Sequence, residues 1–240
     1  MTLKTLPLPL KVLATCFLLT VGAGYLFALA YVYFIDLEPH TKHGLGVVET
    51  FIVKYYGNRQ GSRLEAALAG SMGEMVTLEE KRQIIRWLRQ GALETEFVSI
   101  QPILKQACAD CHGPESRRAT TPLLNSYSDV SKYTTVDVGD SIKSLVRVSH
   151  IHLFGISFIF MLTSVIFSFS ETSPVFRSLL IAIPFGAIWL DIGSWWFTKY
   201  QPAFAYTVII GGAVTGLALA GQISISLYEM WLKGVQKAST

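Results

Sequence analysis

Two cysteines and a histidine lie within five residues of one another, in the segment Cys108-Ala-Asp-Cys111-His112. This C-x-x-C-H spacing is typical of covalent haem attachment, because two thiols one helical turn apart can add to the two vinyl groups on one porphyrin edge. The adjacent imidazole then binds the iron. The segment therefore predicts one covalent haem c, attached through Cys108 and Cys111 and ligated by His112.

Two other sites could use the same pair of cysteines. A thiol–disulfide redox pair of the thioredoxin type is expected in a βαβ context, and no stretch of this chain alternates as strands do. A zinc site needs two more soft ligands, whereas the third cysteine, Cys16, lies inside an apolar run. We interpret Cys16 as an ordinary packing residue and retain haem attachment for the pair.

The residues around the motif carry a resemblance to a known family. Ile100-Gln-Pro-Ile-Leu104 precedes the first cysteine by three residues, Gly113 follows the histidine, and Leu123-Leu-Asn-Ser-Tyr127 comes after it. This arrangement resembles c-type cytochrome domains over roughly residues 97–130. The resemblance implies a small helical fold that carries covalent haem, and it does not identify a partner.

The second axial ligand of the iron is not evident from the motif. Small c-type cytochromes usually supply a methionine downstream, and none lies between His112 and the apolar run that begins at residue 148. His150 is the preferred candidate because the predicted haem domain runs directly into it, and Arg147 is expected to pair with a haem propionate. The alternatives are His152, the upstream Met72 and Met75, His40, His43 and an open coordination site.

Local signals predict helices around the motif. Pro102 suits the first turn of a helix whose end carries the cysteines. Thr77-Leu-Glu-Glu80 is a capping box that opens a helix ending at Gly91, with Ile84, Ile85 and Leu88 inward. Residues 62–72 also have a helical pattern. An all-α fold is expected.

The composition is that of an integral membrane protein. Hydrophobic residues make up 51% of the chain and charged residues 15%, with a mean hydropathy of +0.42. Apolar runs at 12–35, 148–169, 179–197 and 203–228 can each cross a bilayer, which takes about 20 helical residues. We interpret the first run as a retained anchor because it exceeds the length of a signal-peptide core. The net charge of +3, without basic runs, excludes nucleic acid as a partner.

Nearly all of the charge lies between the first and second runs, where residues 36–148 hold fourteen basic and fourteen acidic side chains. We therefore divide the chain into an N-terminal tail with the first transmembrane helix (1–35), a haem domain (36–147), and three transmembrane helices with the C-terminal tail (148–240). The remaining bases set the orientation by the positive-inside rule. Five of them fall on one side of a four-helix arrangement: Lys4, Lys11, Arg177, Lys233 and Lys237. This predicts cytoplasmic termini and a periplasmic haem domain at the bacterial cytoplasmic (inner) membrane.

Three ionisable side chains lie within the apolar runs, where charge is costly: His150, His152 and Asp191. For Asp191 we expect either a structural ion pair with Arg147, His150 or His152, or a role in proton transfer or quinol binding. A second metal ion is not expected, although the pairs His40/His43 and His150/His152 contain side chains that could bind one. The segment Gly212-Ala-Val-Thr-Gly216 predicts close helix packing, within this chain or with another subunit.

These observations favour a membrane-bound mono-haem c-type cytochrome that transfers electrons as a subunit of a larger respiratory or other membrane redox complex. An anchor alone needs one helix, so the three further helices are expected to contact other subunits. A soluble periplasmic electron carrier and the lipid bilayer complete the expected partners. The alternatives are a quinol-oxidising subunit with its site near His150, His152 and Asp191, and a scaffold or redox sensor in which haem is structural. Whether the chain is itself an enzyme is left open.

Overall fold

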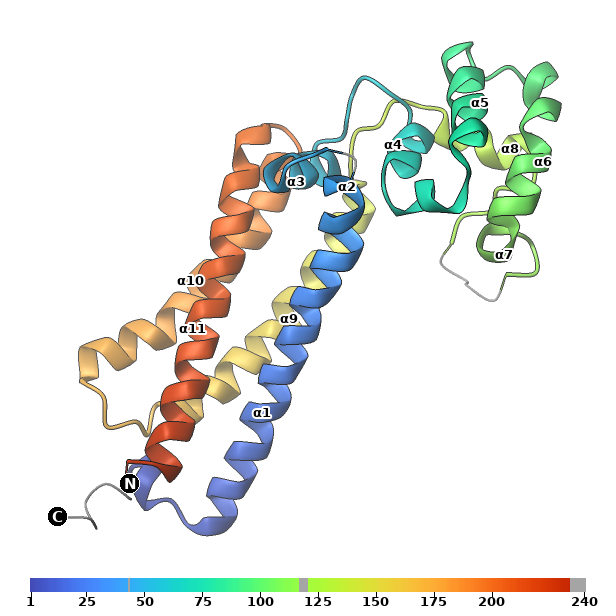
Figure 1. Ribbon diagram of the computed structural model, residues 1–240. Coiled ribbons are helices and arrows are strands. Elements are labelled where there is room, and N and C mark those ends of the chain that lie inside the picture. The colour runs from blue at the N-terminus through green and yellow to red at the C-terminus, as the bar shows by residue number, and fades with distance from the viewer. Residues whose placement is uncertain (43, 117–120, 234–240) are drawn as a thin grey trace. The chain divides into compact units, whose positions relative to one another are not determined.

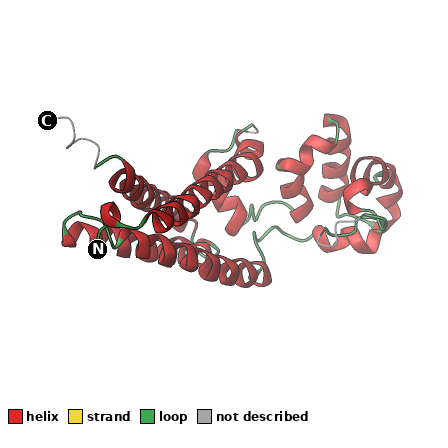
Figure 2. Cartoon of the chain, turned by 90° about the horizontal axis from the view of Figure 1, so that it is seen from below, coloured by secondary structure: helices red, strands yellow, loops and turns green. Residues whose placement is uncertain are grey.

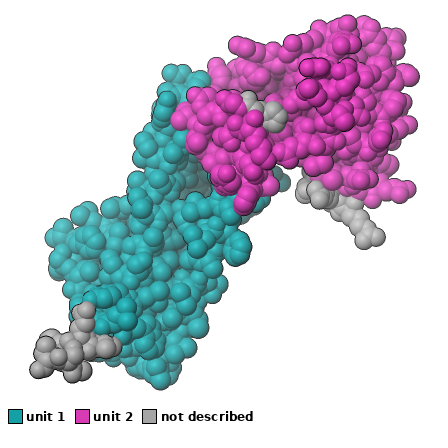
Figure 3. Space-filling model, viewed as in Figure 1, with its two compact units in different colours: residues 1–32, 141–240 teal, residues 33–140 magenta. Residues whose placement is uncertain are grey.

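The computed structural model describes residues 1–42, 44–116 and 121–233, and helices joined by loops make up this part of the chain (Figures 1 and 2). No strand occurs in it, and the extended segments pair only at an isolated bridge between Ser62 and Val136. The predicted all-helical class is confirmed for these ranges. The chain divides into two compact units, residues 1–32 with 141–240 and residues 33–140 (Figure 3).

Four long helices build the first unit: α1 (Leu8–Tyr31), α9 (Ile142–Phe167), α10 (Pro174–Thr198) and α11 (Ala205–Trp231). Each belongs to a helical segment long and apolar enough to cross a bilayer, which confirms the four predicted spans. The bounds of the helices differ from those of the apolar runs. α9 begins at Ile142 rather than near residue 148, because the Ser141 hydroxyl accepts a hydrogen bond from the Ser144 amide at 3.1 Å and caps it.

The tail before α1 folds back onto the bundle. Leu3, in the short 3-10 helix η1 (Leu3–Thr5), is fully buried, and its amide donates to the carbonyl of Phe169 at 2.9 Å. Leu3 shares an apolar cluster with Ala14, Leu18 and Met230. The Lys11 ammonium donates to the Met230 carbonyl at 3.0 Å. The beginning of α1 and the end of α11 therefore meet at the same end of this unit.

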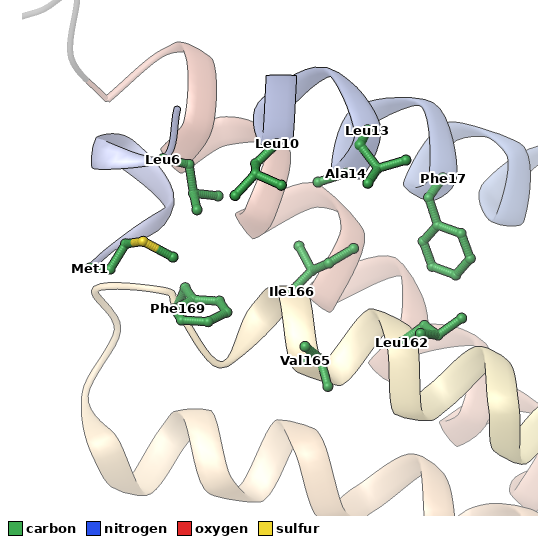
Figure 4. Close-up of a pocket in the computed structure, with 10 residues that line it drawn as sticks. All are labelled: Met1, Leu6, Leu10, Leu13, Ala14, Phe17, Leu162, Val165, Ile166 and Phe169. Atoms are coloured by element: carbon green, nitrogen blue, oxygen red, sulfur yellow. The ribbon is translucent and has the colours of Figure 1, made fainter. Parts of the chain in front are cut away.

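A groove between α1 and α9 opens at that end of the unit (Figure 4). It is lined mainly by Leu10, Leu13 and Phe17 of α1 and by Leu162, Val165 and Ile166 of α9. These side chains offer only hydrocarbon, so the groove suits a lipid acyl chain and has no side chain that could orient a polar ligand.

Two glycines bring the helices of this unit close together. A Cβ atom at Gly211 of α11 would lie 2.9 Å from the Cα of Asp191 on α10, and one at Gly216 would collide with the Tyr25 hydroxyl on α1. The Tyr25 hydroxyl also donates to the Gly212 carbonyl at 3.5 Å. The predicted close packing of the 212–216 segment is confirmed, and its partner is α1 of the same chain.

Pro184 interrupts the hydrogen-bond ladder of α10, because proline has no N–H to donate to the carbonyl of Leu180 four residues earlier. Gln222 of α11 replaces that donor, with its side-chain amide 2.8 Å from the Leu180 oxygen. The same amide lies 3.3 Å from the Ser164 hydroxyl of α9, and Gln222 is only 1% exposed. Lipid offers no replacement donor, so this one side chain satisfies the proline defect and joins three helices.

The second unit consists of short helices. They are α2 (Glu38–Thr41), α3 (Val47–Tyr55), α4 (Arg63–Ala69), α5 (Leu78–Arg89), α6 (Gln101–Ile103), α7 (Ala109–His112) and α8 (Tyr127–Val130). The π-helical turns η2 (Val32–Leu37) and η5 (Leu104–Cys108) and the 3-10 turns η3 (Ser71–Met75), η4 (Glu94–Ser99) and η6 (Ser131–Tyr133) connect them.

The predicted capping box of α5 is present, with the Thr77 hydroxyl accepting from the Glu80 amide and the Glu80 carboxylate accepting from the Thr77 amide. The helix predicted over residues 62–72 is shorter than expected, because α4 ends at Ala69 and Gly70 leads into η3. Trp87 is the side chain that the sequence analysis missed in this region. It is buried, and its ring lies 5.8 Å from that of Phe97 and 6.5 Å from that of Tyr127.

The two ends of the second unit are tied together by Asp137. This buried carboxylate accepts hydrogen bonds from the amides of Asn58 at 2.8 Å and Gly139 at 3.0 Å. Gly57 and Gly139 both have positive φ, and a Cβ at Gly57 would collide with the Gly139 amide. Residues 57–61 and 135–140 therefore pass each other in direct backbone contact.

Candidate functional site

The cysteine motif lies on a helical segment that changes pitch as it reaches the cysteines. α6 runs through the π-helical turn η5 into α7, and Pro102 is in the first turn, as predicted. The segment ends at Gly113, whose amide donates to the Ala109 carbonyl at 2.7 Å. A Cβ atom at position 113 would lie 2.5 Å from that same oxygen, so only glycine fits where the chain turns away after His112.

The imidazole of His112 is oriented by the segment that follows the motif. Its Nδ1 lies 2.7 Å from the carbonyl oxygen of Pro122. Because a carbonyl accepts and does not donate, Nδ1 carries a proton, and in the neutral imidazole the lone pair is then on Nε2. A metal-binding histidine is usually held in this way, with one ring nitrogen hydrogen-bonded and the other directed at the metal.

Two further hydrogen bonds fasten the same segment to the motif. The Thr121 hydroxyl donates to the Cys111 carbonyl at 2.7 Å, and the Leu124 amide donates to the His112 carbonyl at 3.0 Å. Residues 121–124 therefore make three hydrogen bonds with the end of α7. These hydrogen bonds fix the position of the imidazole together with the side-chain torsions of His112.

The thiols of Cys108 and Cys111 are both free and half-buried. Cys108 packs against the apolar core of the second unit. Burial raises the pKa of the Cys108 thiol above its usual range, and the nearby Glu80 carboxylate and Cys111 act in the same direction. Within the described residues no group of three or more His, Cys, Asp or Glu side chains could hold a metal ion, so the zinc alternative has no further ligands there.

Cys16 differs from the sequence-based interpretation. It is exposed on α1 rather than packed inside the bundle. The apolar thiol needs no packing partner on a helix that faces lipid, which is the physical reason that burial could not be inferred from the apolar run.

Exposed apolar side chains come from the two segments that border the motif. Met75 is 61% exposed and Leu78 is 64% exposed, and both are near Glu80, which acts on the Cys108 thiol. Leu123, which is 48% exposed, follows Pro122. A small cleft beside His112 is lined by Leu104, Lys105, Ala109, Gly113, Leu124 and Asn125. An extended apolar group attached at the cysteines could cover these surfaces.

The other predicted haem residues are distributed over both units. Arg147, His150 and His152 are exposed on α9, which belongs to the first unit, so their predicted roles toward the iron stay predictions. His40 is in the same unit as the motif, and its Nδ1 donates to the Asp36 carbonyl at 2.7 Å. His43 lies outside the described residues.

Asp191 of α10 has a hydrogen-bond partner that the sequence analysis did not name. Its carboxylate accepts from the indole Nε1 of Trp195, one turn later, at 2.9 Å. The Trp195 ring is met edge-on by the ring of His152, at a centroid distance of 5.3 Å. The helical spacing of four residues was the available signal for the first of these contacts.

A family model described as a transmembrane helical domain, Aq_1264_TM, matches residues 135–237. No curated protein and no solved structure matches the chain. The matched region contains α9, α10 and α11, which agrees with their assignment as membrane helices in a multi-pass protein. The cysteine motif lies outside it.

The sequence analysis named the cysteines and the histidine of the motif but missed what orients the histidine. Pro122 is ten residues away along the chain, and it contributes only its backbone carbonyl, which any residue type has. Its proline ring restricts the backbone and is the one signal that could have drawn attention to this position.

Proposed function

We propose that residues 33–140 form a haem c domain and that the protein is a membrane-bound mono-haem c-type cytochrome. The observation that carries this proposal is the hydrogen bond from His112 Nδ1 to the Pro122 carbonyl, at 2.7 Å, inside a C-x-x-C-H motif. This hydrogen bond selects the tautomer in which Nε2 can bind iron, and it forms between groups of the polypeptide alone.

The residues around the motif suit a covalently attached haem. Cys108 and Cys111 would hold it by thioether bonds, and His112 would be one axial ligand. When bound, haem c supplies a one-electron iron couple. The half-buried position of Cys108 against the apolar core, together with the exposed Met75, Leu78 and Leu123, provides an apolar setting for the macrocycle. Lys105, at the cleft beside His112, is available to a propionate within the same unit.

For the second axial ligand we favour Met75 over the sequence-based preference for His150. Val76, which immediately precedes the capping residue Thr77 of α5, belongs to the same apolar cluster against which Cys108 packs. Met75 lies two residues before Thr77, in the short turn η3, and its side chain is exposed rather than committed to the core. Thioether ligation raises the reduction potential of the haem. His150 stays an alternative, because it belongs to the other unit.

The setting that we propose is the bacterial cytoplasmic membrane, with the haem domain on the periplasmic side and electron transfer to a soluble periplasmic carrier. The four spans support a role as a subunit of a larger redox complex, because one span would be enough for an anchor. Exposed aromatic and aliphatic side chains along these spans are available to lipid and to other subunits.

The test is covalent haem on the full-length chain, produced in a host that attaches haem c. After denaturing electrophoresis and extraction with acidic organic solvent, haem is expected to remain on the 26.6 kDa band. Cys108→Ala and Cys111→Ala should each leave at most a weak band. Cys16→Ala, which removes the cysteine outside the motif, is the matched control and should retain the signal of the unaltered protein. Complete extraction of haem from the unaltered protein would refute the proposal.

A further inference from the structure

A cluster of polar side chains lies inside the first unit, among residues 1–32 and 141–240. We call it the Asp191 cluster and define it as Tyr25, His152, Asp191 and Trp195. These residues come from α1, α9 and α10, and α11 packs against them through Gly211 and Gly216. The cysteine motif belongs to the other unit.

Asp191 lies within the membrane-spanning part of α10. Thr198 ends that helix seven residues later, which corresponds to about 10 Å along the axis. A carboxylate at such a depth is costly unless it is hydrogen-bonded, and the Trp195 indole supplies one hydrogen bond at 2.9 Å. Backbone atoms of α11 approach Asp191 so closely that no side chain would fit at Gly211. The carboxylate is therefore held in a defined position.

His152 presents a hydrogen-bond acceptor on the exposed side of α9. Its Nδ1 donates to the Val148 carbonyl at 2.9 Å, so in the neutral imidazole Nε2 is the hydrogen-bond acceptor. The side chain is exposed, and its ring meets Trp195 edge-on. An acceptor on a membrane helix is costly unless a donor covers it, and hydrocarbon provides none.

Tyr25 adds a hydroxyl to the same region. It lies within electrostatic range of Asp191 and is directed at the Gly212 carbonyl by the hydrogen bond at 3.5 Å. The cluster thus combines a carboxylate and an imidazole acceptor with the aromatic surfaces of Trp195 and Tyr25, in a membrane setting.

We propose that the Asp191 cluster binds the headgroup of a membrane-soluble hydroquinone. Such a headgroup is a flat ring that partitions into the bilayer and carries two O–H donors, so it matches two acceptors beside an aromatic surface. One hydroxyl donates to His152 Nε2 and the other to the Asp191 carboxylate. A phospholipid acyl chain offers no donor to either group. Binding of hydroquinone to the Asp191 cluster does not depend on the haem. Only a role of the hydroquinone as electron donor to the haem would rest on the proposed function.

The experiment uses the full-length protein in lipid nanodiscs free of quinone, with a short-chain ubiquinol as the probe under anaerobic conditions. Removal of a hydrogen bond to a charged group weakens binding by roughly 10- to 100-fold. We expect that loss in Kd for Asp191→Asn, which preserves the size and one acceptor oxygen, and a similar loss for His152→Ala.

Matched controls lie two residues away on the same helices, which is about 200° around the axis and therefore on the opposite face. Trp189→Phe on α10 and Phe154→Leu on α9 alter side chains that are each 68% exposed, and both should bind the probe as the unaltered protein does. A photoreactive quinone analogue should attach to peptides of α9 or α10.

Several results would overturn the proposal. One is an unchanged Kd in Asp191→Asn and His152→Ala, with or without a loss of thermal stability. The others are photolabelling confined to helices other than α9 and α10, and absence of binding to the isolated protein. A Cys108→Ala/Cys111→Ala variant should bind the probe normally, so a failure of haem attachment and a failure of quinol binding are distinguishable.

Discussion

The imidazole of His112 is held in place by the polypeptide alone, through one side-chain hydrogen bond to Pro122. The Thr121 hydroxyl and the Leu124 amide donate to carbonyls of the helix end that carries it. A ligand that is already oriented loses less conformational freedom when it binds a metal. At the scale of single residues, the proposed haem site would therefore combine two thiols for covalent attachment with an imidazole that is already oriented.

The axial ligand on the opposite face gives a prediction at this scale. Met75→Ala should remove the thioether-to-iron charge-transfer band from the oxidised spectrum and lower the reduction potential by on the order of 100 mV. Met72→Ala alters the other methionine of the same turn and should leave both quantities unchanged. A band that persists in Met75→Ala, or a spectrum that changes only in His150→Ala, would contradict the assignment of Met75.

At the scale of elements, each helix of the membrane unit has a specific polar contact in addition to its apolar surface. The clearest is the amide of Gln222, which replaces the donor that Pro184 removes from α10. A proline in a spanning helix is tolerated when a neighbouring helix satisfies the freed carbonyl. The helix pair α10 and α11 is thereby set in one register.

Gln222→Leu should destabilise the protein by about 1–3 kcal/mol, because it leaves the buried Leu180 carbonyl without a donor. Unfolding in mixed micelles, followed by circular dichroism, measures the effect. Pro184→Ala restores the backbone N–H, so the double variant Pro184→Ala/Gln222→Leu should recover part of the loss. Strictly additive effects of the two substitutions would show that the amide does not serve the proline defect.

The backbone contact between residues 57–61 and 135–140 gives a second prediction at the scale of elements. Asp137→Ala removes the acceptor for two amides at a buried position and should cost about 2–4 kcal/mol. Asp137→Asn keeps one acceptor oxygen and should cost less. Denaturant unfolding of the full-length protein, read from the fluorescence of the buried Trp87, measures both. Equal effects of the two substitutions would mean that the hydrogen bonds are not responsible.

At the scale of the whole molecule, charge and helix count together predict the orientation that we propose. Lys11 and Lys233 both lie at the end of the first unit where α1 begins and α11 ends, and Lys233 pairs there with Glu171 and Glu229 at 3.0 Å each. Basic side chains near the ends of spans are retained on the cytoplasmic side. The second unit carries twelve basic and fourteen acidic side chains and is inserted between the first two spans.

We expect a reporter fused after Lys237 to be active only as a cytoplasmic reporter, and one fused after Asp140 only as an exported reporter. Both fusions keep the first span, so the pair tests the side of the haem domain and the number of spans together. Activity of the Asp140 fusion as a cytoplasmic reporter would contradict the proposed orientation. It would also contradict the proposed haem, because haem c is attached on the outer side of the cytoplasmic membrane.

Much of the helical framework followed from local sequence. The capping box at Thr77 and the turn at Pro102 involve residues within four positions of each other, so local spacing was sufficient to predict them. Boundaries were less accurate, as at α9, where the helix is capped at Ser141 in a polar stretch that hydropathy does not mark.

By itself, the sequence determined the all-helical class, the four spans and the three residues of the C-x-x-C-H motif, because hydrophobic length and the spacing of reactive side chains are local properties. Only the tertiary structure decided which groups complete them. The Pro122 carbonyl, the Gln222 amide and the ring of His152 each act on a partner ten, 42 or 43 residues away in the chain. Such contacts depend on how helices pack, and backbone carbonyls and amide side chains carry no spacing signal for them. The division of the chain into two units likewise assigns Met75 to the unit of the motif and His150 to the other unit.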